Sequence, residues 1–318
     1  SINQCEAAGI RWHYVYKQAG KHIGFLLRLT KQIKKASPDI IFLHGSGAIP
    51  AAFLASLITA KKQQIIVRET QANHLKTKAE WMGLKLSLWL ADKVVFLSEQ
   101  YKNEIEKRRL FGYKASKIAV IPNGVNLDLF KPAHKVIALP VVLGMQSRLV
   151  AIKDHNTLIT ALYLLKQKYG PGKFVLQIAG DGIYKEKLLQ STKTLSLEND
   201  VYFLGLLKES DLPIFLQSCD IYIHASLGET MSTAIMQAMA CKLPVIASDV
   251  DGINNMITNR YSGILVKPQQ PELLADAINM VEQDAYLRQQ IATNALKEAE
   301  NNFSNIKMFL LYRSIFIS

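Results

Sequence analysis

The chain has 318 residues, 49% of them hydrophobic, and a formal net charge of +12 at pH 7. This size and composition predict a folded globular protein and favour two domains over one. They exclude a disordered or low-complexity chain. The cysteines Cys5, Cys219 and Cys241 are odd in number and irregularly spaced, which excludes a disulfide framework and a zinc-finger type of site. The cysteine pattern favours a reducing compartment, and we expect a cytoplasmic protein.

The longest stretch without a charged residue, at positions 40–60, is about as long as a bilayer requires. Gly45, Gly47 and Pro50 interrupt it, so it predicts a strand, a loop and a helix rather than a membrane span. The positive charge is unevenly distributed: residues 1–135 hold 22 Lys/Arg against 9 Asp/Glu, and residues 136–318 hold 16 against 17. A basic first half indicates either a solvated surface or an anionic partner such as a phospholipid face. Nucleic acid is not expected, because no RNA- or DNA-binding motif is present.

Short β-branched runs alternate with longer amphipathic segments along the whole chain, a pattern typical of βαβ units and parallel sheets. The strands predicted in the first half are residues 10–16, 39–44, 64–69, 93–98 and 118–122. Those predicted in the second half are residues 141–148, 174–179, 201–204, 221–225, 244–248 and 263–266. Helices are predicted at residues 23–35, 154–168, 185–195, 230–240 and 304–316. The fold class is therefore α/β, with two Rossmann-like doubly wound sheets.

The segment 131–140, which carries Pro132 and Pro140 and has no helical period, is the predicted linker. We expect an N-terminal domain of residues 1–135 and a C-terminal domain of residues 136–318, with the final helix free to pack back on the first domain. The first half offers five strands where the second offers six, and the chain opens on Ser1. The simplest interpretation is that an N-terminal strand and its loop are missing.

Two cations follow the strand predicted at 141–148. Arg148 leaves that strand, and Lys153 lies five residues later, just before a predicted helix. Ligands of open α/β sheets bind beyond the carboxyl ends of the strands, and cations beside a helix N-terminus can hold a diphosphate without a metal ion. The alternative is a pair of ordinary surface cations.

Two glycine-containing strand ends add weaker signals. Gly180 and Gly182 follow the strand predicted at 174–179, and glycine permits a tight turn or the close approach of a ligand. Gly205 follows the next strand, where exposed backbone groups could bind a nucleobase edge. Each could equally be a simple turn.

The stretch G-E-T-M-S-T-A-I-M-Q at 228–237 places an acid ahead of the predicted helix 230–240. The unpaired N–H groups expected at Met231, Ser232 and Thr233 favour an anion or the hydroxyls of a polar ligand. Glu229 would accept hydrogen bonds from sugar hydroxyls, and Gln237, about two turns along the same side, could contact a second set. The alternatives are an acid that complements the helix dipole and a polar residue at a helix edge.

Taken in order, these stretches resemble the family 4 glycosyltransferases, which are retaining enzymes of the GT-B fold. The matching stretches are P-D-I-I-F-L-H-G (38–45), W-L-A-D-K-V-V-F-L-S-E (89–99), I-P-N-G-V-N-L-D-L-F-K-P (121–132), S-R-L-V-A-I-K (147–153), I-A-G-D-G (178–182), V-Y-F-L-G (201–205), and H-A-S-L-G-E-T with A-M-A-C-K-L-P-V-I-A-S-D-V-D-G-I (224–253). The resemblance implies two Rossmann-like domains facing a cleft. The second would bind a nucleotide sugar and the first an acceptor.

Carried over by position, the resemblance makes Arg148 and Lys153 the pair that holds the diphosphate and stabilises the leaving group, so that no metal or other cofactor is expected. Glu229 matches the first acid of the E-x7-E motif, which holds donor-sugar hydroxyls, and the second acid is replaced by Gln237. The implied reaction retains the anomeric configuration, with the departing phosphate oxygen deprotonating the acceptor. The resemblance therefore predicts a hexosyltransferase that uses a UDP- or GDP-sugar in the synthesis of a surface polysaccharide, lipopolysaccharide or glycolipid.

The implied acceptor side contains Gly45, Thr70 and His74. Thr70 stands where many relatives carry a histidine, and His74 is a candidate substitute. With Gln237 and the missing start, this departure leaves a second hypothesis open, a nucleotide-sugar-binding homologue or partner subunit with impaired catalysis. A nucleotide-sugar epimerase fits less well, because the stretch around Glu229 is typical of the transferases.

The basic first half is consistent with an acceptor that is attached to lipid. The stretch 75–90 mixes Lys76, Lys78 and Lys85 with Trp81 and Trp89, as in a helix that lies on an anionic membrane. The alternative is that its apolar face packs on its own domain. We therefore expect a cytoplasmic protein, with peripheral contact to the membrane face as the open question.

Overall fold

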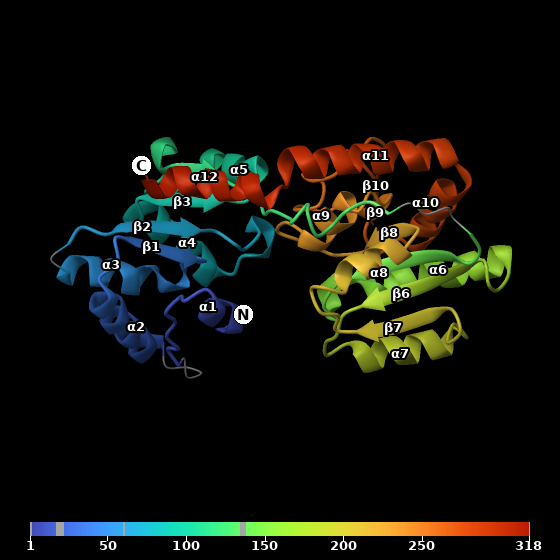
Figure 1. Ribbon diagram of the computed structural model, residues 1–318, viewed down its shortest axis with the longest axis horizontal. Coiled ribbons are helices and arrows are strands. Elements are labelled where there is room, and N and C mark those ends of the chain that lie inside the picture. Colours follow the sequence, from blue (N-terminus) through green and yellow to red (C-terminus); the bar gives the residue numbers. More distant parts are fainter. Residues whose placement is uncertain (1, 17–21, 60, 134–137, 318) are drawn as a thin grey trace. The chain divides into compact units, whose positions relative to one another are not determined.

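The computed structural model describes residues 2–16, 22–59, 61–133 and 138–317, which form two compact units, each built on a parallel sheet (Figure 1). The first unit runs through residue 71 and again over residues 76–120, and the second holds residues 72–75 and the chain from residue 121 onward. The boundary predicted near residue 135 and the return of the final helix onto the first domain stay predictions. Part of the predicted linker, residues 134–137, lies outside the described residues.

The first unit is built on a sheet with the order β1-β2-β3-β4. All of its strand pairs are parallel, and His44 at the end of β1 lies in register with Arg68 at the end of β2. The strands are β1 (Ile40–His44), β2 (Gln64–Arg68), β3 (Lys93–Phe96) and β4 (Ile118–Val120). The helices are α1 (Ile2–Ala7), α2 (His22–Ala36), α3 (Ile49–Ile58), α4 (Lys78–Leu90) and α5 (Glu99–Lys107).

The prediction of a strand at residues 10–16 is wrong, because these residues belong to no helix or strand. Its alternating apolar side chains are exposed, from 43% at Trp12 to 77% at Tyr14. An alternating segment forms a strand only where a neighbouring strand completes its backbone hydrogen bonds. β1 pairs with β2, and residues 10–16 pair with neither.

The second unit has a six-stranded parallel sheet with the order β10-β9-β8-β5-β6-β7. Counted from β5, this is the 3-2-1-4-5-6 order of a dinucleotide-binding fold, in which the strand order reverses between β5 and β8. The strands are β5 (Val141–Gln146), β6 (Phe174–Ala179), β7 (Val201–Gly205), β8 (Ile221–His224), β9 (Val245–Ser248) and β10 (Ile264–Val266). The helices are α6 (His155–Tyr169), α7 (Lys185–Thr194), α8 (Leu212–Ser218), α9 (Thr233–Ala240), α10 (Pro271–Gln283), α11 (Ala285–Asn302) and α12 (Asn305–Ile317).

A continuous apolar core holds this sheet against its helices. Leu143 of β5, Ile178 of β6, Ile223 of β8, Leu158 of α6 and Ile278 of α10 are all fully buried in it. Burying side chains of this size contributes about 1.5–3 kcal/mol each. The strands that carry the site at their carboxyl ends are therefore rigidly placed.

Among the described residues, no helix is both long enough and apolar enough to cross a membrane. The charge-free stretch at 40–60 instead supplies β1, a short 3-10 turn (Ser46–Ala48) and α3, as its glycines and proline predicted.

Candidate functional site

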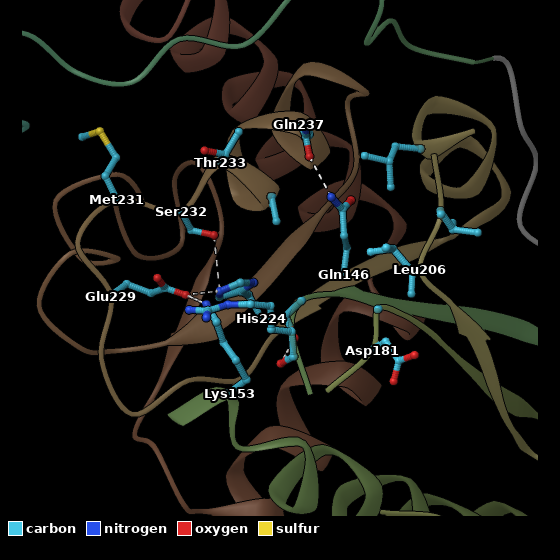
Figure 2. Close-up of a pocket in the computed structure, with 17 residues that line it drawn as sticks. Gln146, Lys153, Asp181, Leu206, His224, Glu229, Met231, Ser232, Thr233 and Gln237 are labelled. Carbon is cyan, nitrogen blue, oxygen red and sulfur yellow. Dashed lines mark hydrogen bonds and ion pairs between the residues drawn. The ribbon is translucent and has the colours of Figure 1, made fainter. Parts of the chain in front are cut away.

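A pocket of about 460 Å³ lies in the second unit, at the carboxyl ends of β5, β6 and β8 and the loop that follows β7 (Figure 2). This is the edge beside the β5/β8 reversal, where open α/β sheets bind their ligands. The lining residues are Gln146, Ser147, Arg148, Lys153, Ala179, Gly180, Asp181, Leu206, Leu207, Leu212, His224, Glu229, Met231, Ser232, Thr233, Ala234 and Gln237. The structure thus brings together most of the residues predicted to bind the donor.

The cationic side of the pocket comes from the turn between β5 and α6. Arg148 follows β5, and Lys153 ends a short 3-10 turn (Ala151–Lys153). Asp154, in the left-handed region with φ 37°, then turns the chain into α6. Arg148 and Lys153 both line the pocket. Arg148 is exposed, whereas the Lys153 side chain is mostly buried.

The loop that carries Glu229 is tied to this turn. The Leu227 N–H donates to the Ile152 carbonyl at 2.8 Å, and the Ser226 hydroxyl lies 3.1 Å from the same oxygen. The Ser226 N–H donates to the Ser248 hydroxyl at 3.0 Å. These bonds place Glu229 next to Lys153, with which it forms an ion pair.

Glu229 is held as a carboxylate inside the pocket wall. Its side chain is 14% exposed and that of Lys153 is 13% exposed. Burial by itself raises the pKa of Glu229, but a hydrogen bond with His224 and the nearby positive charge of Lys153 outweigh it and lower that pKa to about 2. The His224 Nε2 atom lies 2.9 Å from Glu229 Oε1. The pocket therefore contains a fixed negative charge between two nitrogen groups (Figure 2).

The helix behind Glu229 begins later than the sequence predicted. We expected it to run from residue 230, but α9 begins at Thr233, with Ser232 as its N-cap in an extended conformation. The Ser232 hydroxyl accepts a hydrogen bond from the Ile235 N–H at 3.4 Å, which is the usual role of an N-cap serine. The first-turn N–H groups that can face a ligand are therefore those of Thr233, as predicted, and Ala234, whereas Met231 and Ser232 precede the helix. Met231 and Ser232 still line the pocket, ahead of the helix.

Gln237 lies one helical turn beyond the N-terminus of α9 and is 9% exposed. Its Oε1 atom accepts a hydrogen bond from the Gln146 side-chain amide at 3.0 Å. Gln146 ends β5. The two amides thus form a pair on the pocket wall (Figure 2).

The glycines at the strand ends shape the floor of the pocket. Gly180 has φ 146°, and a Cβ atom there would overlap the carbonyl oxygen of Ser147. Its N–H donates to the Gly205 carbonyl at 2.8 Å, which ties the ends of β6 and β7 together. Gly205, predicted as a donor-binding residue, is not among the lining residues; the next two residues, Leu206 and Leu207, are.

The three residues predicted for the acceptor side belong to different units. Gly45 and Thr70 are in the first unit, where a Cβ atom at Gly45 would lie 3.6 Å from the Thr70 hydroxyl. His74 belongs to the second unit, and its Nδ1 atom lies 3.7 Å from a carboxylate oxygen of Asp251. A Cβ atom at Gly228, beside Glu229, would come within 2.8 Å of the His74 ring.

Sequence reasoning missed His224, Gln146, Asp181 and Leu206 as pocket residues. His224 stands at the head of the H-A-S-L-G-E-T stretch, and its position as the last residue of β8 was the available signal. Within the part of the chain that the structure describes, no cluster of three or more His, Cys, Asp or Glu is arranged to hold a metal ion.

A 3-2-1-4-5-6 parallel sheet with cations, a carboxylate and a helix N-terminus at its reversal point is a nucleotide-binding α/β domain. Two parallel α/β units in one chain are the composition of the GT-B class of fold. The chain belongs to the family described as glycosyl transferases group 1, whose model matches residues 131–298. A second model, described as glycosyltransferase family 4, matches residues 4–129.

Curated relatives and solved structures agree with this assignment. The chain is 26% identical over 324 residues, or 93% of its length and 80% of the relative's, to the UDP-Gal:alpha-D-GlcNAc-diphosphoundecaprenol alpha-1,3-galactosyltransferase of Escherichia coli. It is 29% identical over 240 residues, or 70% of its length and 59% of the relative's, to the N,N'-diacetylbacillosaminyl-diphospho-undecaprenol alpha-1,3-N-acetylgalactosaminyltransferase of Campylobacter jejuni. The crystal structure of Anabaena HepE in complex with UDP and glucose is similar over 100% of this chain and 89% of that one, with 22% identity and a TM-score of 0.83.

These matches confirm the predicted family and the GT-B fold, and the chain is a glycosyltransferase.

Proposed function

We propose that the chain transfers a hexosyl group, with retention of configuration and without a metal ion, from a UDP- or GDP-sugar to a saccharide or lipid-linked acceptor in surface polysaccharide or glycolipid synthesis. The single observation that carries the proposal is the pocket in which Arg148, Lys153, Glu229 and the N-terminus of α9 converge. Hydrogen-bonding groups of opposite charge at neighbouring positions match a ligand that joins an anionic diphosphate to a neutral sugar.

In the proposed complex, Arg148 and Lys153 contact the diphosphate, and the first-turn N–H groups of α9 contribute further donors. Glu229 accepts hydrogen bonds from the sugar hydroxyls. As the bond between the anomeric carbon and the phosphate oxygen breaks, negative charge develops on that oxygen, and fixed cations stabilise it most where water is excluded. The new bond to the acceptor oxygen forms on the same face of the sugar, and the acceptor proton passes to the departing phosphate oxygen.

The amide pair of Gln146 and Gln237 bears on the alternative of an impaired homologue. An amide pair offers both a donor and an acceptor to the ribose hydroxyls, although it lacks the charge of the family's second acid. Arg148, Lys153 and Glu229 are retained in one pocket. The transferase is therefore the function that the pocket supports better.

The relatives also bear on the acceptor. The Escherichia coli and Campylobacter jejuni enzymes are named for acceptors joined to undecaprenol through a diphosphate. An acceptor of this kind would bring the present chain to the cytoplasmic face of a membrane, where its basic first half would be attracted to anionic lipid. Gly45, Thr70 and His74 remain the residues proposed for the acceptor side.

The structure changes the details of the membrane hypothesis. Lys76 does not face solvent, because its side chain is fully buried and lies 3.8 Å from Glu69. Lys78, Met82, Lys85 and Trp89 are exposed residues of α4 at helical spacing, and the Trp89 ring lies 6.1 Å from that of Phe111, which is 71% exposed. This mixture of cations and exposed apolar side chains fits the surface of an anionic membrane.

Calorimetry with UDP- and GDP-sugars tests the donor site. Arg148→Ala and Glu229→Ala are each expected to weaken binding of the preferred nucleotide sugar by at least tenfold. Arg313→Ala and Glu300→Ala, which change exposed residues of α12 and α11, serve as matched controls. Unchanged affinity in both pocket variants would refute the assignment of the site.

Co-sedimentation with vesicles tests the membrane contact separately. Phosphatidylglycerol vesicles at low salt should retain the wild type, and Trp89→Ser should weaken that binding. Trp12→Ser is the matched control, because Trp12 is also exposed but lies outside α4. Equal sedimentation of the two variants would show that α4 is not the contact.

A further inference from the structure

His224 is a buried histidine whose two ring nitrogens both face polar partners. It is the last residue of β8 and is 1% exposed. Its Nε2 atom lies 2.9 Å from Glu229 Oε1 and 3.3 Å from the Ser232 hydroxyl. Its Nδ1 atom lies 3.4 Å from the hydroxyl of Tyr222. The proposed mechanism gives this residue no role.

The partners on each side determine which nitrogen carries the proton. Burial lowers the pKa of His224, so the ring is neutral near pH 7 and carries one proton. The Glu229 carboxylate can only accept a hydrogen bond, so the proton belongs on Nε2. The Nδ1 atom is then an acceptor and requires a donor opposite it.

Tyr222 can supply that donor. It is fully buried, and burial raises the pKa of its hydroxyl, so the hydroxyl keeps its proton. The Gln146 N–H lies 3.3 Å from the Tyr222 oxygen and donates to it. The Tyr222 proton is therefore shared between the Gln146 carbonyl, at 3.3 Å, and His224 Nδ1. A chain of hydrogen bonds runs from the end of β5, through Tyr222 and His224 of β8, to Glu229. Figure 2 shows its last link, between His224 and Glu229.

This chain controls the orientation of the carboxylate. His224 and Lys153 both contact Oε1 of Glu229. Lys153 is a flexible point charge, whereas an imidazole fixed by two strands defines a direction. The Ser232 hydroxyl, which caps α9, meets the same His224 nitrogen. The orientation of Glu229 is thereby coupled to the start of the helix whose N–H groups line the pocket.

We propose that His224 is a positioning residue, which holds the Glu229 carboxylate in the orientation that binds the hydroxyls of the donor sugar, and that Tyr222 fixes its tautomer. The inference rests on the proposed function, and it concerns the sugar end of the donor rather than the diphosphate. It therefore predicts a loss that appears with a nucleotide sugar and not with the free nucleoside diphosphate.

Calorimetry on the full chain tests the proposal with paired probes. The wild type is first titrated with UDP-glucose, UDP-galactose, UDP-N-acetylgalactosamine and GDP-mannose. The nucleotide sugar that it binds most tightly is then used as one probe, and the parent UDP or GDP as the other. His224→Leu and His224→Asn, which place no donor at the Nε2 position, should weaken binding of the nucleotide sugar about 10- to 100-fold. Binding of the parent diphosphate should change less than threefold.

A matched variant separates positioning from packing. The longer amide of His224→Gln can place an N–H near the position of Nε2, so this variant should bind the nucleotide sugar within about threefold of the wild type. Tyr222→Phe, which removes the donor to Nδ1, should fall between the wild type and His224→Leu. A thermal unfolding scan of each variant shows whether the chain is folded. If His224→Gln is as weak as His224→Asn, or if both probes weaken equally, the proposal is wrong.

The tautomer can be observed without any ligand. Two-bond ¹H–¹⁵N correlation spectra of protein with labelled histidine should show His224 protonated on Nε2 in the wild type. A ring protonated on Nδ1 would overturn the proposal, even if the variants also failed to fold.

The outcomes distinguish this inference from the proposed function. If Glu229→Ala loses nucleotide-sugar binding and His224→Leu does not, only the role of His224 is refuted. If Glu229→Ala also binds normally, or if the wild type binds none of the four nucleotide sugars, the proposed donor site fails, and the role of His224 with it.

Discussion

The ion pair between Lys153 and Glu229 allows a quantitative prediction for Lys153→Met. The side chains of the pair are only 13% and 14% exposed. The fall in the pKa of Glu229 from its ordinary value of 4.5 to about 2 corresponds to roughly 3 kcal/mol of favourable interaction with the charged form. Removing one partner of a buried pair leaves the other charge uncompensated, which typically costs 3–5 kcal/mol. Because His224 remains beside Glu229, we expect a loss near the lower end, about 3 kcal/mol.

The double variant Lys153→Met/Glu229→Gln isolates the cause of that loss. Replacing both charges by neutral groups of similar size should restore the free energy of unfolding to within about 1 kcal/mol of the wild type, whereas nucleotide-sugar binding should stay lost. Lys193→Met, at an exposed position of α7, is the control.

The interactions of the Glu229 carboxylate also make the stability of the fold depend on pH. Its folded pKa lies below its ordinary value, so the stabilisation is complete above about pH 5 and is lost as the pH falls from 4.5 toward 2. As the pH falls over that range, the free energy of unfolding of the wild type should therefore decrease relative to that of the double variant.

Urea unfolding followed by far-UV circular dichroism is the suitable assay. The three tryptophans, Trp12, Trp81 and Trp89, all belong to the first unit, so their fluorescence does not report directly on the pocket. The reasoning is refuted if Lys153→Met is as stable as the wild type at pH 7, or if the double variant is no more stable than Lys153→Met alone.

Three further predictions concern the walls of the pocket. Gly180→Ala should lower both the melting temperature and the affinity for the nucleotide sugar, because its Cβ atom would overlap the Ser147 carbonyl oxygen. Gly47→Ala, which has open space around its Cβ position, is the control in a thermal scan. Equal effects of the two substitutions would contradict the prediction. Gln146→Leu, which removes the hydrogen bond to Gln237, should weaken UDP or GDP binding about 10-fold in calorimetry, and unchanged affinity would speak against the amide pair. Ser232→Ala should cost about 1 kcal/mol of unfolding free energy in urea, and Ser232→Asn, which can still cap α9, should recover most of it; a variant as stable as the wild type would rule out the cap.

Much of the second unit could be predicted from the sequence, because its strands and helices have strong local signals. The strand predicted at 174–179 has the observed bounds of β6, and the helix predicted at 154–168 is displaced by one residue from α6. The turn with Arg148 and Lys153 was also predictable, since cations after a strand and before a helix lie on the ligand-binding edge of a parallel sheet.

The exceptions show where local patterns fail. The alternation at residues 10–16 predicted a strand, but the backbone there has no sheet partner. The helix predicted from residue 230 begins at Thr233, because Ser232 caps it and residues 230–232 form the loop that carries Glu229 to Lys153. Lys76 was one of the cations on which the membrane hypothesis rested, yet its side chain is buried next to Glu69.

The sequence by itself determined the class of fold, the order of the motifs and the residue types available to a phosphorylated sugar. The periodicity of hydrophobic residues and the position of each polar residue after a strand are local properties, so they can be recognised one segment at a time. Only the tertiary structure decided that His224 contacts Glu229, that Gln146 pairs with Gln237, and that His74 and Thr70 belong to different units. The contacts of His224 and of Gln146 join residues from different segments of the second unit, and the parallel order of the sheet, not the spacing along the chain, brings them together.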